Sequence, residues 1–325
     1  MLYRTTIFSF IFFILFSSCG QTGKTKAISL AHGLDSNHSV HKAMVRMDEI
    51  LDSISEGKLT LEIYPSQQLG TERECLELLQ IGSLDMTKVS AGVMENFSPG
   101  MKIFGLPFLF RDREHSFQVL DGPIGKELLN GGEKFWLKGM GYYDAGSRSF
   151  YTKEKPVYAP DDLKGLKIRV MESVSAMNMV NSLGGSPTPI SWGELYTSLQ
   201  QGVVDGAENN PPSFYLSRHY EVCKYYTLDE HTVLPDVLII GTHVWNRLNK
   251  QEQEWLQVAV DISVKYQRTL WAEAEKEALT EVKKAGVKII KPDKTLFSEK
   301  VNNLYEQYKN DKEMYALIQQ IRNTK

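Results

Sequence analysis

The chain has 325 residues, and its 40 Asp and Glu side chains nearly balance its 37 Lys and Arg side chains. The formal net charge of −3, with no basic tract, argues against a nucleic-acid partner. Three cysteines are too few for a disulfide framework, and none has zinc-ligand spacing to a histidine. The length allows two domains of ordinary size.

The first segment predicts export. Arg4 precedes an apolar run at 7–16, and two serines and Cys19 follow that run. Such a run is too short to span a bilayer and is typical of a signal peptide. Because a cysteine after small residues is typical of a lipoprotein cleavage site, we expect residues 1–19 to form a lipoprotein signal peptide with Cys19 lipidated. We therefore expect a periplasmic protein anchored to the membrane by lipid. The alternative is an ordinary secretory signal with an incidental Cys19.

From Lys26 onward, short apolar runs alternate with helical patterns, which is typical of α/β proteins. We expect strands at 27–32, 59–64 and 84–90, and a helix at 40–54. A second helix begins at Thr71, which forms a capping box with Glu74, and ends near Gly82. Cys75 lies inside this helix and is interpreted as a small buried hydrophobe, and a bridge to Cys223 has no support.

The second half of the chain follows the same pattern. Ser191 and Glu194 predict another capping box, and the helix that they open ends before Gly202. A short strand is expected at 203–205. The segment 250–285 contains neither Gly nor Pro, which predicts one long helix or two merged helices.

Apolar residues recur along this long segment at helical spacing; they are Trp255, Val258, Ile262, Tyr266 and Leu270. A helix of this length does not fit inside one small domain, so we expect it to run along two of them. Because the sequence has no obvious linker, both domains are expected to be discontinuous.

The motifs of enzyme active sites do not occur in the sequence. It has no nucleophile elbow, phosphate loop, dinucleotide fingerprint or zinc motif. His32, His38 and His41 are unevenly spaced across a strand end and a helix start, which does not favour a metal site. We therefore expect neither a metal nor a cofactor, and no catalysis.

Two arginines have unusual surroundings. Arg169 lies in a mostly apolar strand at 166–171, and Arg148 is flanked by small residues. A guanidinium suits a carboxylate because two parallel N–H bonds match its two oxygens. The alternative, which spacing alone favours, is an exposed arginine paired with a local acid.

Three further side chains each have two interpretations. Asn209 ends an apolar strand, and its amide can contact a ligand or cap the following turn. Trp192 can stack on a sugar ring or belong to the core. Lys88 interrupts the strand at 84–90 and can reach an anion or extend to solvent.

Several segments together resemble the solute-binding subunits of TRAP transporters, the DctP-like family. The resemblance covers essentially the whole mature chain. Its most specific segments are Gln68–Gly70, Leu84–Met86, Leu106–Phe110, Leu163–Arg169 and Leu199–Asn209.

This resemblance implies a two-lobed α/β fold of the periplasmic-binding-protein type, with a long helix that spans both lobes. The lobes expected are lobe I, 27–146 plus 234–274, and lobe II, 147–233 plus 275–325. It also implies a monomer that binds a small carboxylate and delivers it to the small and large membrane subunits of a transporter.

The resemblance also implies roles for individual residues. Arg169 matches the principal carboxylate clamp of the family, Asn209 matches the amide that assists it, and Arg148 matches a second basic contact. Trp192 falls where relatives place a bulky residue beside the ligand. Ser90 follows a strand whose loop contacts ligand in relatives, and Lys88 is a further candidate contact.

The segments 70–74, 192–196 and 229–231 resemble the sugar-acid branch, whose members bind uronates such as glucuronate or galacturonate. Glu72 and His38 are then candidates for hydroxyl contacts, although Glu72 can equally supply favourable charge at a helix N-terminus. Two alternatives stay open: a binding protein for a C4-dicarboxylate or an aldonate, and an exported enzyme acting on sugar acids, which would need a poised acid–base pair.

Overall fold

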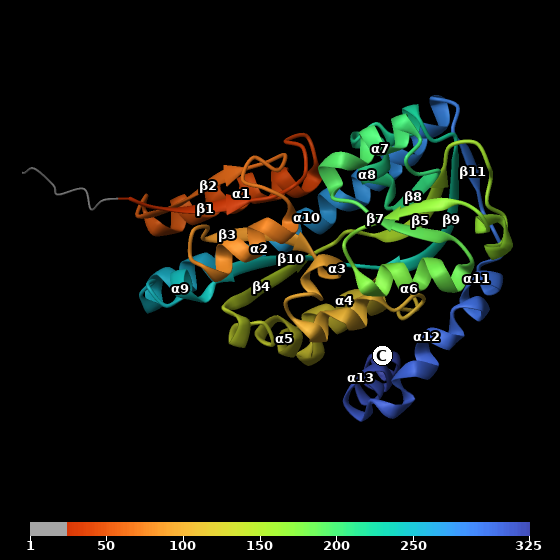
Figure 1. Cartoon of the computed structure of the whole chain (residues 1–325). Coiled ribbons are helices and arrows are strands. Elements are labelled where there is room, and N and C mark those ends of the chain that lie inside the picture. Colours follow the sequence, from red (N-terminus) through yellow and green to blue (C-terminus); the bar gives the residue numbers. More distant parts are fainter. Residues whose placement is uncertain (1–24) are drawn as a thin grey trace, which may run out of the picture.

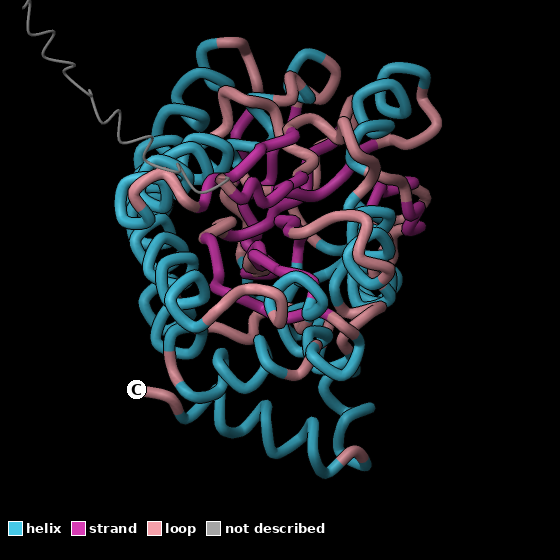
Figure 2. Tube along the Cα trace, turned by 90° about the vertical axis from the view of Figure 1, so that its left-hand side faces the viewer, coloured by secondary structure: helices cyan, strands magenta, loops and turns pink. Residues whose placement is uncertain are grey.

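The computed structural model describes residues 25–325, which form an α/β protein with two sheets (Figure 1). The predicted signal peptide and Cys19 lie outside the described residues. Helices lie on the outside and strands on the inside (Figure 2). Every helix within residues 25–325 is too short or too polar to cross a membrane.

The first sheet has the strand order β2-β1-β3-β10-β4. Its strands are β1 Lys26–Ala31, β2 Leu59–Tyr64, β3 Met86–Ser90, β4 Leu137–Tyr143 and β10 Asp236–Gly241. The first three strands pair in parallel, whereas β10 is antiparallel to both β3 and β4. The helices between these strands are α1 Ser39–Ser55, α2 Glu72–Gln80, α3 Ala91–Met94, α4 Arg113–Asp121, α5 Pro123–Asn130 and the 3₁₀ helices η1 Pro99–Gly105 and η2 Glu133–Phe135, with α9 Thr242–Trp245 after β10.

The second sheet has the strand order β11-β9-β5-β8-β6-β7. Its strands are β5 Ser147–Thr152, β6 Lys167–Val170, β7 Ser186–Pro189, β8 Gly206–Asn209, β9 Tyr225–Val233 and β11 Lys288–Ile290. Its helices are α6 Val174–Leu183, α7 Leu195–Gln201, α8 Pro211–Leu216, α11 Lys294–Lys300, α12 Asn302–Glu306 and the 3₁₀ helices η3 Pro160–Leu163, η4 Trp192–Glu194 and η5 His219–Glu221. The chain therefore enters the second sheet after β4 and returns to the first through β10.

One helix, α10 Lys250–Lys284, connects the two sheets, as expected from the lack of Gly and Pro (Figure 1). Leu256 and Val260, near its start, belong to the core of the first sheet. Val282, near its end, belongs to the core of the second. Because one rigid helix packs on both lobes, it holds them together behind the space between the sheets.

The sequence predicted the helix α10 correctly, but the apolar residues found at helical spacing do not all lie on its buried face. Val258, Ile262 and Tyr266 are 46%, 42% and 41% exposed. The buried face instead includes polar Gln267, whose amide bonds both the N–H and the C=O of Asp144. Apolar residues occur on both faces, so spacing alone did not identify the packed one.

Two further expectations were wrong in detail. Residues 203–205 are not a strand, because Val203 donates its N–H to the Ser198 carbonyl in the turn that ends α7, and β8 begins only at Gly206. Ser191 does not form a capping box, because its hydroxyl donates to the Glu194 carboxylate instead of accepting from the backbone. The capping box at Thr71 is confirmed, and Cys75 and Cys223 are buried free thiols.

The C-terminal helix α13 Lys312–Asn323 follows the 3₁₀ helix η6 Gln307–Asn310 and lies beside first-lobe helices. His115 on α4 contacts the Ile321 carbonyl at 2.9 Å, and Ile318 is buried in the same core as Val119. The boundaries of the two lobes stay a prediction. All of residues 275–325 were expected in lobe II, whereas α13 packs against the first lobe.

Candidate functional site

A cavity lies between the two sheets, where their strand ends face each other. It measures about 60 Å³, several times the space that one water molecule needs. All eight residues that the sequence proposed as ligand contacts line it: Arg169, Asn209, Arg148, Trp192, Glu72, Ser90, His38 and Lys88. Both lobes contribute to this set.

Arg169, in β6, is a buried cation that has no carboxylate partner among the described residues. It is 2% exposed. Its Nε donates to the Ile190 carbonyl at 2.8 Å, and its guanidinium lies 5.8 Å from the centre of the Trp192 ring. Burial lowers the pKa of Arg169 from its ordinary value, although an arginine stays charged at neutral pH. The two remaining nitrogens of the guanidinium are therefore available to an anion.

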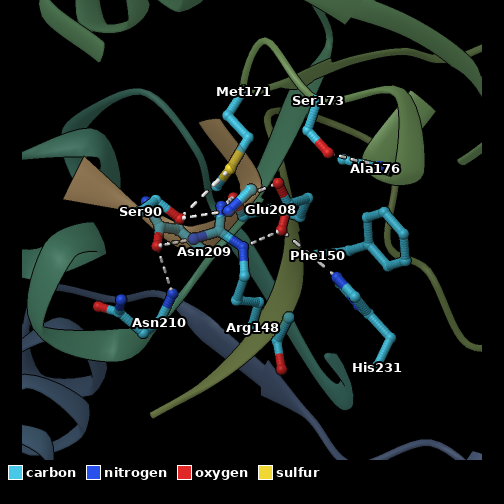
Figure 3. Close-up of polar contacts among 12 residues, drawn as sticks. Ser90, Arg148, Phe150, Met171, Ser173, Ala176, Glu208, Asn209, Asn210 and His231 are labelled. Atoms are coloured by element: carbon cyan, nitrogen blue, oxygen red, sulfur yellow. Dashed lines mark hydrogen bonds and ion pairs between the residues drawn. The ribbon is translucent and has the colours of Figure 1, made fainter. Parts of the chain in front are cut away.

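Arg148, by contrast, is held by protein groups. Its Nε donates to Glu208 Oε2 at 2.5 Å, and its Nη2 donates to Glu208 Oε1 at 2.8 Å. Its Nη1 donates to Asn209 Oδ1 at 2.9 Å (Figure 3). These bonds orient Asn209, because Oδ1 is occupied and the amide nitrogen is left for a ligand. Arg148 therefore positions Asn209 and contributes charge to the cavity.

Behind this pair lies a buried charged group that the sequence did not single out as a site. His231 contacts Asp229 at 2.8 Å. It also lies 3.4 Å from Glu208 (Figure 3). Burial alone would lower the pKa of His231, but the charge and hydrogen bond of Asp229 outweigh it and raise the pKa to about 9. Burial would also raise the pKa of Glu208, but the charge of Arg148 outweighs it and lowers the pKa to about 2. The group is thus a network of ion pairs.

Lys88 forms a second buried charge cluster, on the first lobe. Its Nζ lies 3.1 Å from Glu72 Oε1 and 3.1 Å from Asp236 Oδ2. Burial would lower the pKa of Lys88, but the two carboxylates outweigh it and raise the pKa. Lys88 does not extend to solvent, since it is 2% exposed. Glu72 also accepts a hydrogen bond from the Ser90 N–H at 3.2 Å, so Glu72 has a role beyond charge at the start of α2.

Ser90 and His38 serve first as helix caps. Ser90 Oγ accepts from Gly92 N–H at the start of α3 and lies 3.5 Å from Met171 Sδ of the other lobe (Figure 3). His38 Nδ1 accepts from Val40 N–H at the start of α1. The capping hydrogen bond restricts the rotation of each side chain. Each residue also lines the cavity, so it contributes a polar group there in a fixed orientation.

The cavity lining also includes residues that the sequence did not single out, among them the polar side chains of Asp236 and Trp271. Asp236 begins β10 and Trp271 lies inside α10, so neither stands in a recognisable motif. Neither position could be placed beside the strands of the other lobe without the fold.

Contacts between the lobes extend beyond the cavity. Glu95, after α3, accepts hydrogen bonds from the hydroxyl of Ser173 at 2.8 Å and from the N–H and hydroxyl of Ser175 at 3.0 and 2.6 Å. Ser173 also caps α6, so the Glu95 carboxylate lies at the N-terminus of that helix, where negative charge is favoured. The lobes are thus in contact with each other outside the cavity as well.

The described residues offer no group of three or more His, Cys, Asp or Glu placed to hold a metal ion. His32 and His41 do lie close together, with Nε2 of one 3.0 Å from Nδ1 of the other. That distance fits a hydrogen bond between the two rings, which occupies one nitrogen of each ring.

Comparison with known proteins identifies the family. Residues 30–311 match the model of bacterial extracellular solute-binding proteins, family 7, DctP. An uncharacterized protein of Salmonella typhimurium is 38% identical over 312 residues, which cover 95% of this chain and 94% of that protein.

Two solved TRAP periplasmic solute-binding proteins share the fold. One from Xanthobacter autotrophicus, with bound β-D-galacturonate, is 38% identical with a TM-score of 0.89, over 92% of this chain and all of that one. One from Anaerococcus prevotii, with bound α/β-D-glucuronate, is 34% identical with a TM-score of 0.90, over 93% of this chain and 98% of that one. The chain belongs to the DctP family of bacterial extracellular solute-binding proteins, the solute-binding subunits of TRAP transporters.

Proposed function

We propose that the protein captures the monoanion of a hexuronate, such as galacturonate or glucuronate, and delivers it to the membrane subunits of a TRAP transporter. The observation that carries this proposal is the buried Arg169 guanidinium, which lacks a carboxylate partner among residues 25–325. A buried charge is costly unless it is paired, and a ligand carboxylate supplies the missing pair through two parallel N–H bonds. Similar proteins that hold galacturonate and glucuronate support the choice of acid.

The distribution of charge favours one carboxylate over two. Lys88 contacts two carboxylates, those of Glu72 and Asp236, so this part of the cavity carries a surplus of negative charge. A second carboxylate on the ligand would be repelled there, whereas hydroxyl groups can donate to these oxygens. This argument favours a hydroxylated monocarboxylate over a C4-dicarboxylate. An aldonate satisfies the same charges, and the ligand panel below separates it from a uronate.

The charge pairing also supports binding without turnover. Glu208 is paired with Arg148, and Glu72 and Asp236 are paired with Lys88. A general base needs a carboxylate or imidazole that is free to take a proton from the substrate. We therefore assign Arg169 to holding the ligand carboxylate, Asn209 to orienting it and Glu72 to its hydroxyls.

Hinge closure is the mechanism that this arrangement supports. Arg169 and Asn209 lie on strands of the second sheet. On the other lobe, Lys88 lies on β3 of the first sheet, and His38 and Glu72 lie at the starts of α1 and α2. Only an arrangement with the lobes together presents both sets to one ligand, so ligand binding selects it. Exclusion of water then strengthens the ion pair with Arg169.

The remaining assignments concern location and assembly. In this proposal the chain is exported, Cys19 is lipidated and the mature protein acts as a monomer at the membrane. Mass spectrometry of the mature N-terminus tests the lipid, since an unmodified Cys19 in the membrane-extracted protein would contradict it.

The ligand is tested by calorimetry and thermal unfolding with galacturonate, glucuronate, gluconate and succinate. A hundredfold excess of ligand over Kd stabilises the folded state by about 2.7 kcal/mol. We expect a uronate to bind most tightly, Arg169→Met to abolish binding, and Arg46→Met, on the exposed side of α1, to leave it unchanged. Stabilisation by succinate alone, or wild-type affinity in Arg169→Met, would contradict the proposal.

A further inference from the structure

We propose that His38 and Trp271 form a pair of N–H donors that bind one or more acceptor oxygens of the ligand. The inference rests on the proposed function, because it describes a second contact point for the acid that Arg169 holds. Both residues line the cavity. His38 Nε2 and Trp271 Nε1 are both buried without a hydrogen-bond partner among residues 25–325.

The tautomer of His38 follows from its cap. Nδ1 accepts the Val40 N–H at 3.2 Å, so that nitrogen carries no proton. The side chain is 2% exposed, and burial, assisted by the charge of Lys88, lowers its pKa to about 3. A neutral imidazole with an accepting Nδ1 carries its proton on Nε2. His38 therefore presents an N–H donor to the cavity.

Trp271 is a donor under all conditions, because the indole Nε1–H cannot accept. It lies on α10 and is 1% exposed. A Cβ at Gly146 would lie 2.9 Å from Nε1, so the indole packs directly on the chain that leaves β4 for β5. Gly146 has a φ of +60°, which favours glycine and keeps that close approach possible. The indole is thus fixed in place.

The two donors belong to one location. The ring centres of His38 and Trp271 are 5.8 Å apart, and the rings are tilted by 50°. Buried polar groups are normally hydrogen-bonded, and two unpartnered donors side by side are uncommon in a core. A bound molecule that supplies acceptor oxygens gives both N–H groups a hydrogen-bond partner.

The chemistry of the pair restricts the ligand. Two N–H donors require an acceptor and disfavour a cation or an ammonium group, so the bound atom is an oxygen of a hydroxyl, ring, carbonyl or carboxylate group. Glu72 and Asp236 line the same cavity and accept hydrogen bonds. A sugar hydroxyl can donate to such a carboxylate and accept from an N–H at the same time. Acids with hydroxyl or ring oxygens beyond the carboxylate are therefore selected over simple carboxylates of the same length.

The test compares Trp271→Phe and His38→Asn with wild type by calorimetry, using the acid of the panel that wild type binds most tightly. Phenylalanine keeps an aromatic ring but removes the N–H. Asparagine is a favoured N-cap and keeps an acceptor for Val40 N–H, but its short amide does not reach the position of Nε2. The control is Trp255→Phe. Trp255 lies on the same helix outside the cavity, and the Lys58 ammonium lies over its ring.

We expect each cavity variant to weaken binding about tenfold or more, since a lost hydrogen bond that leaves polar groups unpaired is worth at least that factor. Trp255→Phe should bind as wild type. Thermal unfolding without ligand shows that each variant is folded, and His38→Asn serves if Trp271→Phe fails to fold.

The two proposals fail in different ways. Wild type that binds none of the acids defeats the proposed function, and this inference with it. Wild type that binds a uronate while both His38→Asn and Trp271→Phe stay within about threefold of its affinity defeats the donor pair alone. Loss of affinity in Trp255→Phe equal to that in Trp271→Phe would also overturn it.

Discussion

Arg148 and Glu208 lie on the neighbouring antiparallel strands β5 and β8, and their side chains form a two-pronged ion pair inside the protein. Arg148 is 6% exposed and Glu208 is 1% exposed. The pair connects the sheet to the ligand site, because the same guanidinium also binds Asn209 Oδ1. Its removal should therefore affect both stability and ligand binding.

The first prediction concerns this pair. Arg148→Met leaves the Glu208 carboxylate buried with His231 as its remaining cationic neighbour, and breaking a buried pair typically costs about 3–5 kcal/mol of unfolding free energy. We expect a loss in that range in urea denaturation. Asp161→Asn breaks an exposed pair with Lys164 and should leave the free energy of unfolding nearly unchanged, because solvent screens such a pair. Equal losses in the two variants would show that the buried pair contributes no more to the free energy of unfolding than the exposed pair does.

The second prediction is a loss of stability at alkaline pH. The pKa of His231 is raised from 6.5 to about 9 in the folded protein, so folding retains a proton that the unfolded chain releases above pH 6.5. The contribution of protonated His231 to the free energy of unfolding is about 3 kcal/mol. This contribution is fully present below pH 6.5 and is lost as the pH rises through 9. Denaturation at pH 6.5 and 9 should show this loss in wild type and not in His231→Gln. The exposed His243→Gln should behave as wild type.

The third prediction is a loss of stability at acid pH. His219 is buried and its hydrogen bond with Tyr151 is 2.9 Å long. Burial, followed by the charge of Arg169, lowers its pKa to about 3. Below pH 6.5 the imidazole takes up a proton in the unfolded chain but stays neutral in the folded protein. The contribution of His219 to the free energy of unfolding is therefore full above pH 6.5 and is lost as the pH falls toward 3.

Two other buried imidazoles add to the acid loss, because burial also lowers the pKa of His32 to about 2 and of His38 to about 3. We therefore expect wild type to be most stable near pH 6.5. His219→Gln should show a shallower decline between pH 6.5 and 5 in thermal unfolding. An unchanged slope in this variant would contradict the assignment.

The elements that depend on local rules were predictable from the sequence. The capping box of Thr71 and Glu74 starts α2, and the uninterrupted segment from Lys250 forms α10. The start of β8 at Gly206 was not predictable, because Val203 and Val204 are as apolar as strand residues. The pairing of Gly206–Asn209 with β5 on one side and β6 on the other decides where the strand lies.

The site likewise contains residues that the sequence predicted and contacts that it did not predict. Arg169 and Asn209 stand in segments that resemble a family, and the fold brings them to one cavity. The resemblance did not reveal that Arg148 is already paired with Glu208, because that contact depends on the register of β5 and β8. Trp271 had no sequence signal at all. It reaches the cavity because α10 crosses behind both lobes.

The last prediction concerns Glu95, which joins the lobes without lining the cavity. Its carboxylate accepts three hydrogen bonds, one from Ser173 and two from Ser175, all in the other lobe. Separation of the lobes breaks these bonds, so they stabilise the arrangement that binds ligand. Hydrogen bonds to a charged group are each worth about 1.5–3 kcal/mol.

Glu95→Ala should therefore weaken ligand binding about tenfold or more by shifting the lobes toward separation. Ser173 still caps α6 through the Ala176 N–H, so that helix should stay intact. Small-angle scattering without ligand should show a larger radius of gyration for Glu95→Ala, and the exposed Glu114→Gln should match wild type in both measurements. Wild-type affinity in Glu95→Ala would mean that the cavity contacts alone hold the lobes together.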